Sequence, residues 1–171
     1  MLCVSVMALG IGGTDKNGAF ACKQMPHLVK MAKKNDLAPA LLVSLIHHES
    51  RWTPTAISRS HACGLTQVIP KYTGGRASGN KKYTCEDLQN PHTSITAGSK
   101  ILSFWIRSYG RGNVKIGLCA YNAGYRCKGE NPNASGMNYA RAVLRTQKRI
   151  QKHLRKLKRR ESKNEVRGSD E

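Results

Sequence analysis

Apolar residues recur at intervals of three or four along most of this chain, which is the pattern of helices with one buried face. No stretch alternates cleanly enough to require a strand, so the sequence predicts a mainly α fold. Any β structure is expected within residues 71–89, a polar, glycine-containing segment that is typical of a loop or flap. The expected helices cover residues 24–35, the stretch from Pro39 to Glu49, residues 64–69, the stretch from Pro91 to Ile106, residues 114–121 and the stretch from Asn138 to Leu157.

Glu49 stands at the end of the apolar helical run 41–46. It follows Leu45 by one helical turn, which places it beside the buried face and not on the water side. Partial desolvation raises the pKa of a carboxyl group and keeps a proton available near neutral pH. Glu49 is therefore the candidate general acid. The alternative is a surface acid that pairs with Arg51 or caps the next segment.

Length and charge restrict the class of protein. A chain of 171 residues can form one domain with a proper core, together with tails, but not two comfortable domains. The net charge of +19 and the isoelectric point near 10.1 indicate a polyanionic partner, which is a nucleic acid, a membrane surface or an acidic envelope polymer. With two Trp and two Phe, the chain has little to stack on single-stranded bases.

Acidic residues are scarce outside the two ends of the chain. Those of the body are Asp36, Glu49, Glu86, Asp87 and Glu130. A glycosidase that uses two carboxylates would have to take Glu86 or Asp87, in the polar loop, as its second. This shortage favours a mechanism that needs one carboxylate. His47 and His48 are helix neighbours that point apart, and no His-Glu-x-x-His or Cys-x-x-Cys spacing occurs, so neither a metal nor another cofactor is expected.

Four short blocks follow one another in a fixed order. They are Glu49-Ser50, Pro54-x-Ala56-x-Ser58, Gly64-Leu65-Thr66-Gln67 and Ala120-Tyr121-Asn122-Ala123-Gly124. Together they resemble the catalytic domain of the soluble lytic transglycosylase family, which is related to goose-type lysozyme, over about residues 25–150. The resemblance implies a lysozyme-like domain that cleaves the bond between N-acetylmuramic acid and N-acetylglucosamine in peptidoglycan. Glu49 would be the sole acid and base: it protonates the leaving oxygen, then deprotonates the muramic acid's own primary hydroxyl, which attacks internally to leave an anhydromuramic acid end.

The same resemblance implies roles for other residues. Tyr121 matches the tyrosine that hydrogen-bonds the catalytic acid, and Gln67 matches the residue that contacts the acetamido groups of the substrate. The remaining expected substrate contacts are Ser50 and Ser58 along the cleft, Asn122 and Gly124 in a cleft-facing turn, and Tyr139 in a motif that resembles the family's closing motif, Asn138-Tyr139-Ala140-Arg141. Thr66 is also expected to contact the substrate, and it departs from the usual Met, which affects the packing under the sugar and hence the subsite preference. Ser58 has a second interpretation as a turn former.

Both ends of the chain differ from its body. Residues 1–22 are read as an apolar leader or signal segment, 23–150 as the catalytic domain, and 151–171 as a basic helical extension with a disordered tail beyond Glu161. Ala19-Phe20-Ala21 offers a small-x-small cleavage site that would leave Cys22 first, although no basic residue precedes the apolar run. An ordinary flexible N-terminus is the alternative.

The six cysteines allow two interpretations. In an oxidising compartment, Cys63 with Cys85 and Cys119 with Cys127 are the pairs that would brace the loops near the active site, which leaves Cys3 or Cys22 over. In the cytosol, all six would be free and buried. Sequence alone does not fix the connectivity.

The reading of function is a monomeric peptidoglycan lytic transglycosylase of the cell envelope or periplasm, or a secreted one. A component of a phage virion is the alternative location. The basic segment 148–160, with its stripe of Ile150, Leu154 and Leu157, is expected to attach the enzyme to anionic envelope surfaces or polymers, or else to be a solvated helix end. Two other functions fit: a goose-type muramidase that uses Glu49 and a water, and a non-catalytic basic module that binds cell-wall glycan or nucleic acid.

Overall fold

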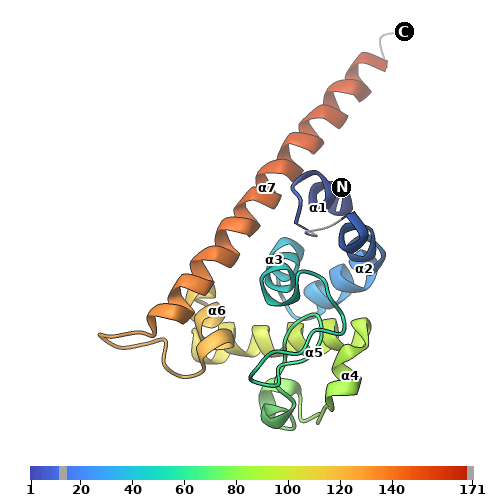
Figure 1. The fold of residues 1–171 in the computed structure, drawn as a ribbon. Coiled ribbons are helices and arrows are strands. Elements are labelled where there is room, and N and C mark those ends of the chain that lie inside the picture. The colour runs from blue at the N-terminus through green and yellow to red at the C-terminus, as the bar shows by residue number, and fades with distance from the viewer. Residues whose placement is uncertain (12–14, 169–171) are drawn as a thin grey trace.

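The computed structural model describes residues 1–11 and 15–168, and Figure 1 shows a helical body from which one long helix projects. The α-helices are α1 (Leu2–Ala8), α2 (Asp15–Lys34), α3 (Pro39–Ser50), α4 (Cys85–Gln89), α5 (Pro91–Phe104), α6 (Val114–Ala123) and α7 (Ala134–Gly168). Two short 3₁₀ turns, η1 (Pro70–Tyr72) and η2 (Arg76–Ser78), precede α4, and a π-helical turn, η3 (Trp105–Tyr109), continues α5. The predicted mainly α fold is confirmed.

Helix α3 lies at the centre of the core and carries Glu49 at its end. The helix begins at Pro39, as expected, and ends where Arg51 adopts a left-handed backbone conformation with φ of 49°. Every residue from 40 to 46 is buried, and α3 packs against α2 and α7. Because the core surrounds α3 on several sides, the last turn of this helix is held in a fixed position.

The prediction of a helix at 64–69 is wrong. This segment is a tight turn, closed by isolated β-bridges that pair Cys63 with Val68 and with Ile57. Gly64 has φ of +75°, and a Cβ there would lie 1.8 Å from the carbonyl oxygen of Leu88. The small β excursion therefore falls within 57–68 and not within 71–89, because the close approach to α4 forces the chain to turn back.

The segment 71–89 is more ordered than a plain loop. It follows directly on the start of η1 at Pro70 and contains η2 and α4, and Thr84 and Asp87 form a capping box at the start of α4. Lys82 lies across this segment and donates hydrogen bonds to the carbonyls of Lys71 and Thr73, 3.3 and 3.2 Å away. Local hydrogen bonds hold this segment in place of a buried apolar face. The sequence therefore has no apolar periodicity here from which the structure could be predicted.

The N-terminal segment packs onto the body through α1. Cys3 forms a disulfide with Cys22 of α2, and Val6 and Ile11 are buried in the main core. The expectation that one of these two cysteines is left over is therefore wrong. Helix α2 begins at Asp15 and runs through the cleavage site expected before Cys22.

Helix α7 is longer than predicted at both ends. It begins at Ala134, ahead of Asn138, and continues through Glu161 to Gly168, where a disordered tail was expected. Ile150 is fully buried and Leu154 packs against the main core, so the helix crosses the expected boundary at 150 without interruption. In the part of the chain that the structure describes, no helix is long and apolar enough to cross a bilayer.

Candidate active site

Glu49 lies in the last turn of α3, and its carboxyl group is partly buried. The hydroxyl of Tyr139, in the second turn of α7, donates a hydrogen bond to Oε1 of Glu49. Burial raises the pKa of Glu49 from 4.5 to about 7, and the Tyr139 hydrogen bond opposes this shift. At neutral pH the carboxyl group is therefore present in both its protonated and its ionised form.

Tyr121 does not make the hydrogen bond that the resemblance implied. Its hydroxyl donates to the carbonyl oxygen of Thr66 at 2.7 Å, and Tyr139 occupies the role of donor to Glu49. Burial, and then the nearby Glu49 charge, raise the pKa of Tyr121 well above its usual value. Tyr121 thus lies within electrostatic reach of Glu49, but its hydroxyl bonds the turn at 64–68 and not the acid.

Tyr139 is the residue whose role the sequence understated. The sequence predicts a substrate contact near the cleft, whereas the Tyr139 hydroxyl bonds the acid itself. Its own pKa is raised well above the usual value, first by burial and then by the Glu49 charge. The motif Asn138-Tyr139-Ala140-Arg141 is enough to predict that Tyr139 lies near the site. The sequence pattern alone does not show which of the two tyrosines, Tyr121 or Tyr139, bonds Glu49.

Thr66 is fully buried and faces α5, so it does not line a substrate surface. Its hydroxyl lies 2.9 Å from the carbonyl oxygen of Ser94, and its backbone N–H donates to the Ser94 hydroxyl at 3.1 Å. A Cβ on Gly98 would lie 2.4 Å from the Cβ of Thr66, so the helix and the turn are in close contact. The expected substrate contact is replaced by a structural one, which holds the turn that carries Gln67.

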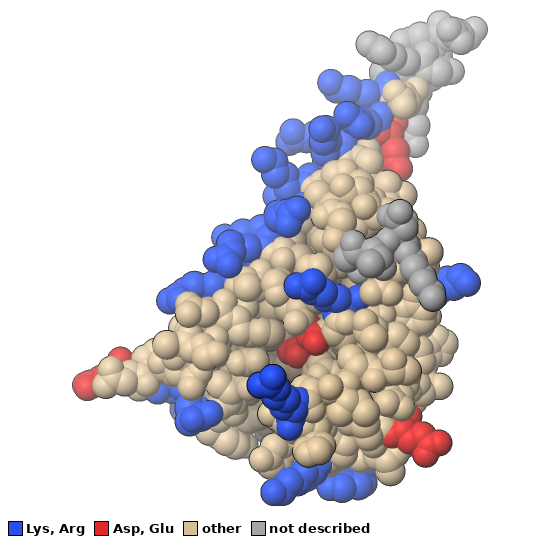
Figure 2. All heavy atoms as spheres, in the orientation of Figure 1, with Lys and Arg blue, Asp and Glu red and all other residues tan. Residues whose placement is uncertain are grey.

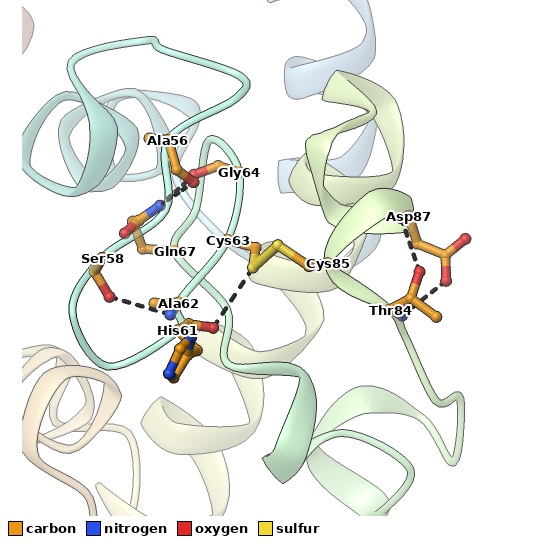
Figure 3. The surroundings of a disulfide bond; sticks show 10 residues. All are labelled: Ala56, Ser58, His61, Ala62, Cys63, Gly64, Gln67, Thr84, Cys85 and Asp87. Atoms are coloured by element: carbon orange, nitrogen blue, oxygen red, sulfur yellow. Dashed lines mark hydrogen bonds between the residues drawn. A yellow bond between two sulfur atoms is a disulfide. The ribbon is translucent and has the colours of Figure 1, made fainter.

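Gln67 is held in a defined orientation, with φ of 49°. Its Nε2 donates to the carbonyl oxygens of Ala56 and Gly64, at 3.0 and 2.9 Å, which uses both amide hydrogens. Figure 3 shows the amide nitrogen pointing at these carbonyls and the amide oxygen pointing away from them. The amide oxygen of Gln67 therefore remains available as a hydrogen-bond acceptor.

The two serines expected along the cleft have structural partners. Ser50 donates to the carbonyl oxygen of Leu65 at 2.9 Å, which ties the end of α3 to the turn. The hydroxyl of Ser58 accepts a hydrogen bond from the backbone N–H of Ala62 at 3.1 Å, as a turn former does (Figure 3). The Cys63–Cys85 disulfide attaches the same loop to α4.

Asn122 and Gly124 lie at the end of α6. Asn122 is exposed, and Gly124 ends the helix with φ of +70°, a conformation that favours glycine. The Cys119–Cys127 disulfide, which was one of the expected pairs, links α6 to the chain just beyond this turn. Cys119 also lies next to Gly136 in the first turn of α7. The end of α6 and the start of α7, which carries Tyr139, are thereby linked.

The candidates for a second carboxylate serve another purpose. Asp87 Oδ2 accepts a hydrogen bond from the backbone N–H of Thr84 at 2.8 Å, and this bond, with the Thr84 hydroxyl, lowers the pKa of Asp87. Glu86 lies beside it in the first turn of α4. Across the described residues, no carboxylate contributes to the pKa shift of Glu49, and no group of three His, Cys, Asp or Glu could hold a metal ion.

Comparison with known proteins fits this arrangement. The model of the transglycosylase SLT domain family matches residues 27–143, which include Glu49, Gln67, Tyr121 and Tyr139. The chain belongs to this family. The membrane-bound lytic murein transglycosylase C of Actinobacillus pleuropneumoniae is 29% identical over 114 residues, which cover 61% of this chain and 31% of that protein. The membrane-bound lytic murein transglycosylase E of Buchnera aphidicola is 34% identical over 77 residues, which cover 43% and 35%.

Solved structures support the same fold. An inactive mutant of the lytic transglycosylase Slt from Pseudomonas aeruginosa matches with a TM-score of 0.65 at 24% identity, over 76% of this chain and 24% of that one. The 70 kDa soluble lytic transglycosylase of Escherichia coli also matches with a TM-score of 0.65, at 20% identity, over 75% and 24%. The chain thus spans about a third of the length of the first of its curated relatives, and about a quarter of these structures.

Proposed function

We propose that this protein is a peptidoglycan lytic transglycosylase that cleaves the bond between N-acetylmuramic acid and N-acetylglucosamine with Glu49 as its only acid and base. The observation that carries the proposal is a single partly buried carboxyl group with a pKa of about 7, hydrogen-bonded by Tyr139. A carboxyl group with this pKa can donate a proton in one step and accept one in the next at neutral pH.

The absence of a second carboxylate near Glu49 in the described residues supports the intramolecular route. A hydrolase with two carboxylates activates a water or forms a covalent intermediate with the second one. Here the primary hydroxyl of the muramic acid would attack its own anomeric carbon. Glu49, ionised after protonating the leaving oxygen, takes the proton of that hydroxyl, so the acid is regenerated and no water is consumed.

Substrate binding is proposed for the segments that meet around Glu49. The amide oxygen of Gln67 would accept a hydrogen bond from the N–H of an acetamido group, because its amide hydrogens are already used within the turn. Asn122 is exposed and would contact the glycan strand beside the turn at Gly124. Thr66 and Tyr121 would act on binding indirectly, by holding the position of that turn.

The disulfides support a place of action in an oxidising compartment. The described chain has three disulfides and no free cysteine, which is typical of exported proteins and unusual in the cytosol. We place the protein, as a monomer, at the cell envelope or outside the cell, where its basic extension would hold it near anionic surfaces or polymers. A virion component that acts on the envelope is the alternative.

The test is mass spectrometry of purified peptidoglycan after digestion with the wild-type chain and with Glu49→Gln, which keeps the shape of the side chain. Anhydromuropeptides from the wild type and none from the variant are expected. Reducing-end products, heavier by one water, would instead make the protein a muramidase. If neither protein cleaves the glycan but both still sediment with peptidoglycan, the protein would be a non-catalytic binding module.

A further inference from the structure

One face of α7 is lined by basic side chains along most of its length. They recur at steps of three or four residues and are all exposed: Arg141, Arg145, Lys148, Lys152, Arg155, Arg159 and Lys163. We call these residues the basic ridge. From Arg141 to Lys163 a straight helix extends about 33 Å. Figure 2 shows Lys and Arg side chains following one edge of the molecule along α7.

The opposite face of α7 is used by the fold. Val143 and Ile150 are fully buried in the main core, and Leu154 packs against it. His153, on the same side, hydrogen-bonds the hydroxyl of Ser5 in α1 at 3.0 Å. Ile150 and Leu154 of the apolar stripe that the sequence offered to a membrane are therefore covered by the protein itself, and Leu157 beyond them is half-buried. The ridge has no apolar residues of its own to insert.

Among the described residues, no acid neutralises the charge of the ridge. No ion pair joins a ridge residue to an acid in the described chain; Arg141 bonds the amide oxygen of Asn138 at 2.7 Å. Glu161 follows Leu154 and Leu157 at helical spacing, so it belongs to the opposite side of α7. Cations left unpaired along a straight edge form an extended positive field toward solvent.

We infer that the basic ridge is a docking surface for an anionic lipid surface, bound flat and by electrostatic attraction alone. A planar surface can meet all cations of a straight ridge at once, whereas the curved backbone of a nucleic acid duplex would meet only some of them. The ridge also has no aromatic side chain that could stack on bases. Because no apolar residue inserts, binding should be reversible and should weaken steeply with salt.

This inference goes beyond the proposed reaction. Most of the ridge lies past residue 143, where the match to the family ends, and none of its residues bonds Glu49. Docking through the ridge would leave the catalytic residues free, and it would keep the enzyme beside its substrate at the envelope. Loss of docking and loss of catalysis are therefore separable in experiments.

The test uses the full chain and a charge-reversed ridge, Arg145→Glu/Lys152→Glu/Arg159→Glu. The control, Lys23→Glu/Lys30→Glu/Arg76→Glu, changes the net charge equally at exposed sites away from α7. Sedimentation with vesicles of phosphatidylglycerol and phosphatidylcholine is compared with sedimentation with phosphatidylcholine alone. Circular dichroism and cleavage of solubilised glycan strands, which need no docking, verify that each variant is folded.

The wild type and the control variant are expected to bind the anionic vesicles at low salt, and about 1 M salt should release them. The ridge variant should bind about a hundredfold more weakly, since each basic residue near such a surface contributes about fivefold or more. An equal loss of vesicle binding in the two variants would show that net charge alone is sufficient for binding, and it would overturn the ridge as the docking surface. Retention in 1 M salt, or tight binding to duplex DNA without vesicle binding, would overturn it as well.

Discussion

The hydroxyl of Tyr139 donates a hydrogen bond to Oε1 of Glu49, across 90 residues of sequence. It joins the start of α7 to the end of α3, so the two helices together form the environment of the acid. Burial and the hydrogen bond act on the pKa of Glu49 in opposite directions, and burial prevails. The acidity of Glu49 is thus a property of the helix packing and can be changed from α7.

Replacing Tyr139 with Phe should raise the pKa of Glu49 above about 7, because the hydrogen bond that favours the ionised form is removed. The basic limb of the pH–rate profile, along which Glu49 loses the proton that it must donate to the leaving oxygen, should therefore move to higher pH. Release of anhydromuropeptides measured from pH 5 to 9 would show the shift.

Tyr121→Phe is the matched control for this experiment. It removes a hydrogen bond to the Thr66 carbonyl, so it should lower stability by about 1 kcal/mol and leave the limb where it is. If the Tyr121 variant moves the limb and the Tyr139 variant does not, Tyr121 is the residue that sets the acidity of Glu49.

Glu49 should make the protein less stable as the pH rises. Its folded-state pKa of about 7 lies above the value of 4.5 for an unperturbed group, so folding disfavours the ionised form. The penalty is absent below about pH 4.5 and complete above about pH 7, where it amounts to about 3 kcal/mol. Glu49→Gln should therefore unfold in urea at a higher midpoint than the wild type at pH 8. The two midpoints should approach each other at pH 4, and a constant difference would contradict the assignment.

Thr66→Met installs the residue that is usual in the family, yet it should destabilise this protein. The side chain is fully buried against Gly98, so a larger residue must displace α5 or the turn, at a cost of about 1–3 kcal/mol. Thermal unfolding would measure the loss. Thr66→Val, which keeps the volume, isolates the contribution of the hydroxyl bond to Ser94. A Met variant as stable as the wild type would show that this packing is loose.

Removal of the Cys63–Cys85 disulfide by Cys63→Ser/Cys85→Ser should lower the free energy of unfolding by about 2–4 kcal/mol. Because the loop it braces carries Gln67, KM for glycan strands should also rise. Cys3→Ser/Cys22→Ser removes a bridge of similar span on the far side of α3, where KM should not change. Urea denaturation measures the loss of stability, and initial rates measure the change in KM. An unchanged KM in both variants would show that the loop takes no part in substrate binding.

Much of the fold could be predicted from local pattern. The limits of α3, α5 and α6 agree closely with the sequence because Pro39, Asn90 with Pro91, and the apolar spacing act within a few residues. The turn at 64–68 was mistaken for a helix because its short apolar run gave the helical spacing, whereas the contact of Gly64 with Leu88 is made by a distant helix.

The sequence by itself determined the family and the position of Glu49 beside a buried face, and it offered two of the three disulfides as one of two interpretations of the cysteines. These depend on neighbouring residues or on ordered motifs. Only the tertiary structure decided that Tyr139 reaches Glu49, that Tyr121 and Thr66 support the turn of Gln67, and that Cys3 pairs with Cys22. It also decided that Val143, Ile150 and Leu154 of α7 are covered by the core and that its basic ridge is exposed. The physical reason is that these relationships depend on how separate helices pack, and a one-dimensional pattern specifies which face of a helix is apolar but not which partner covers it.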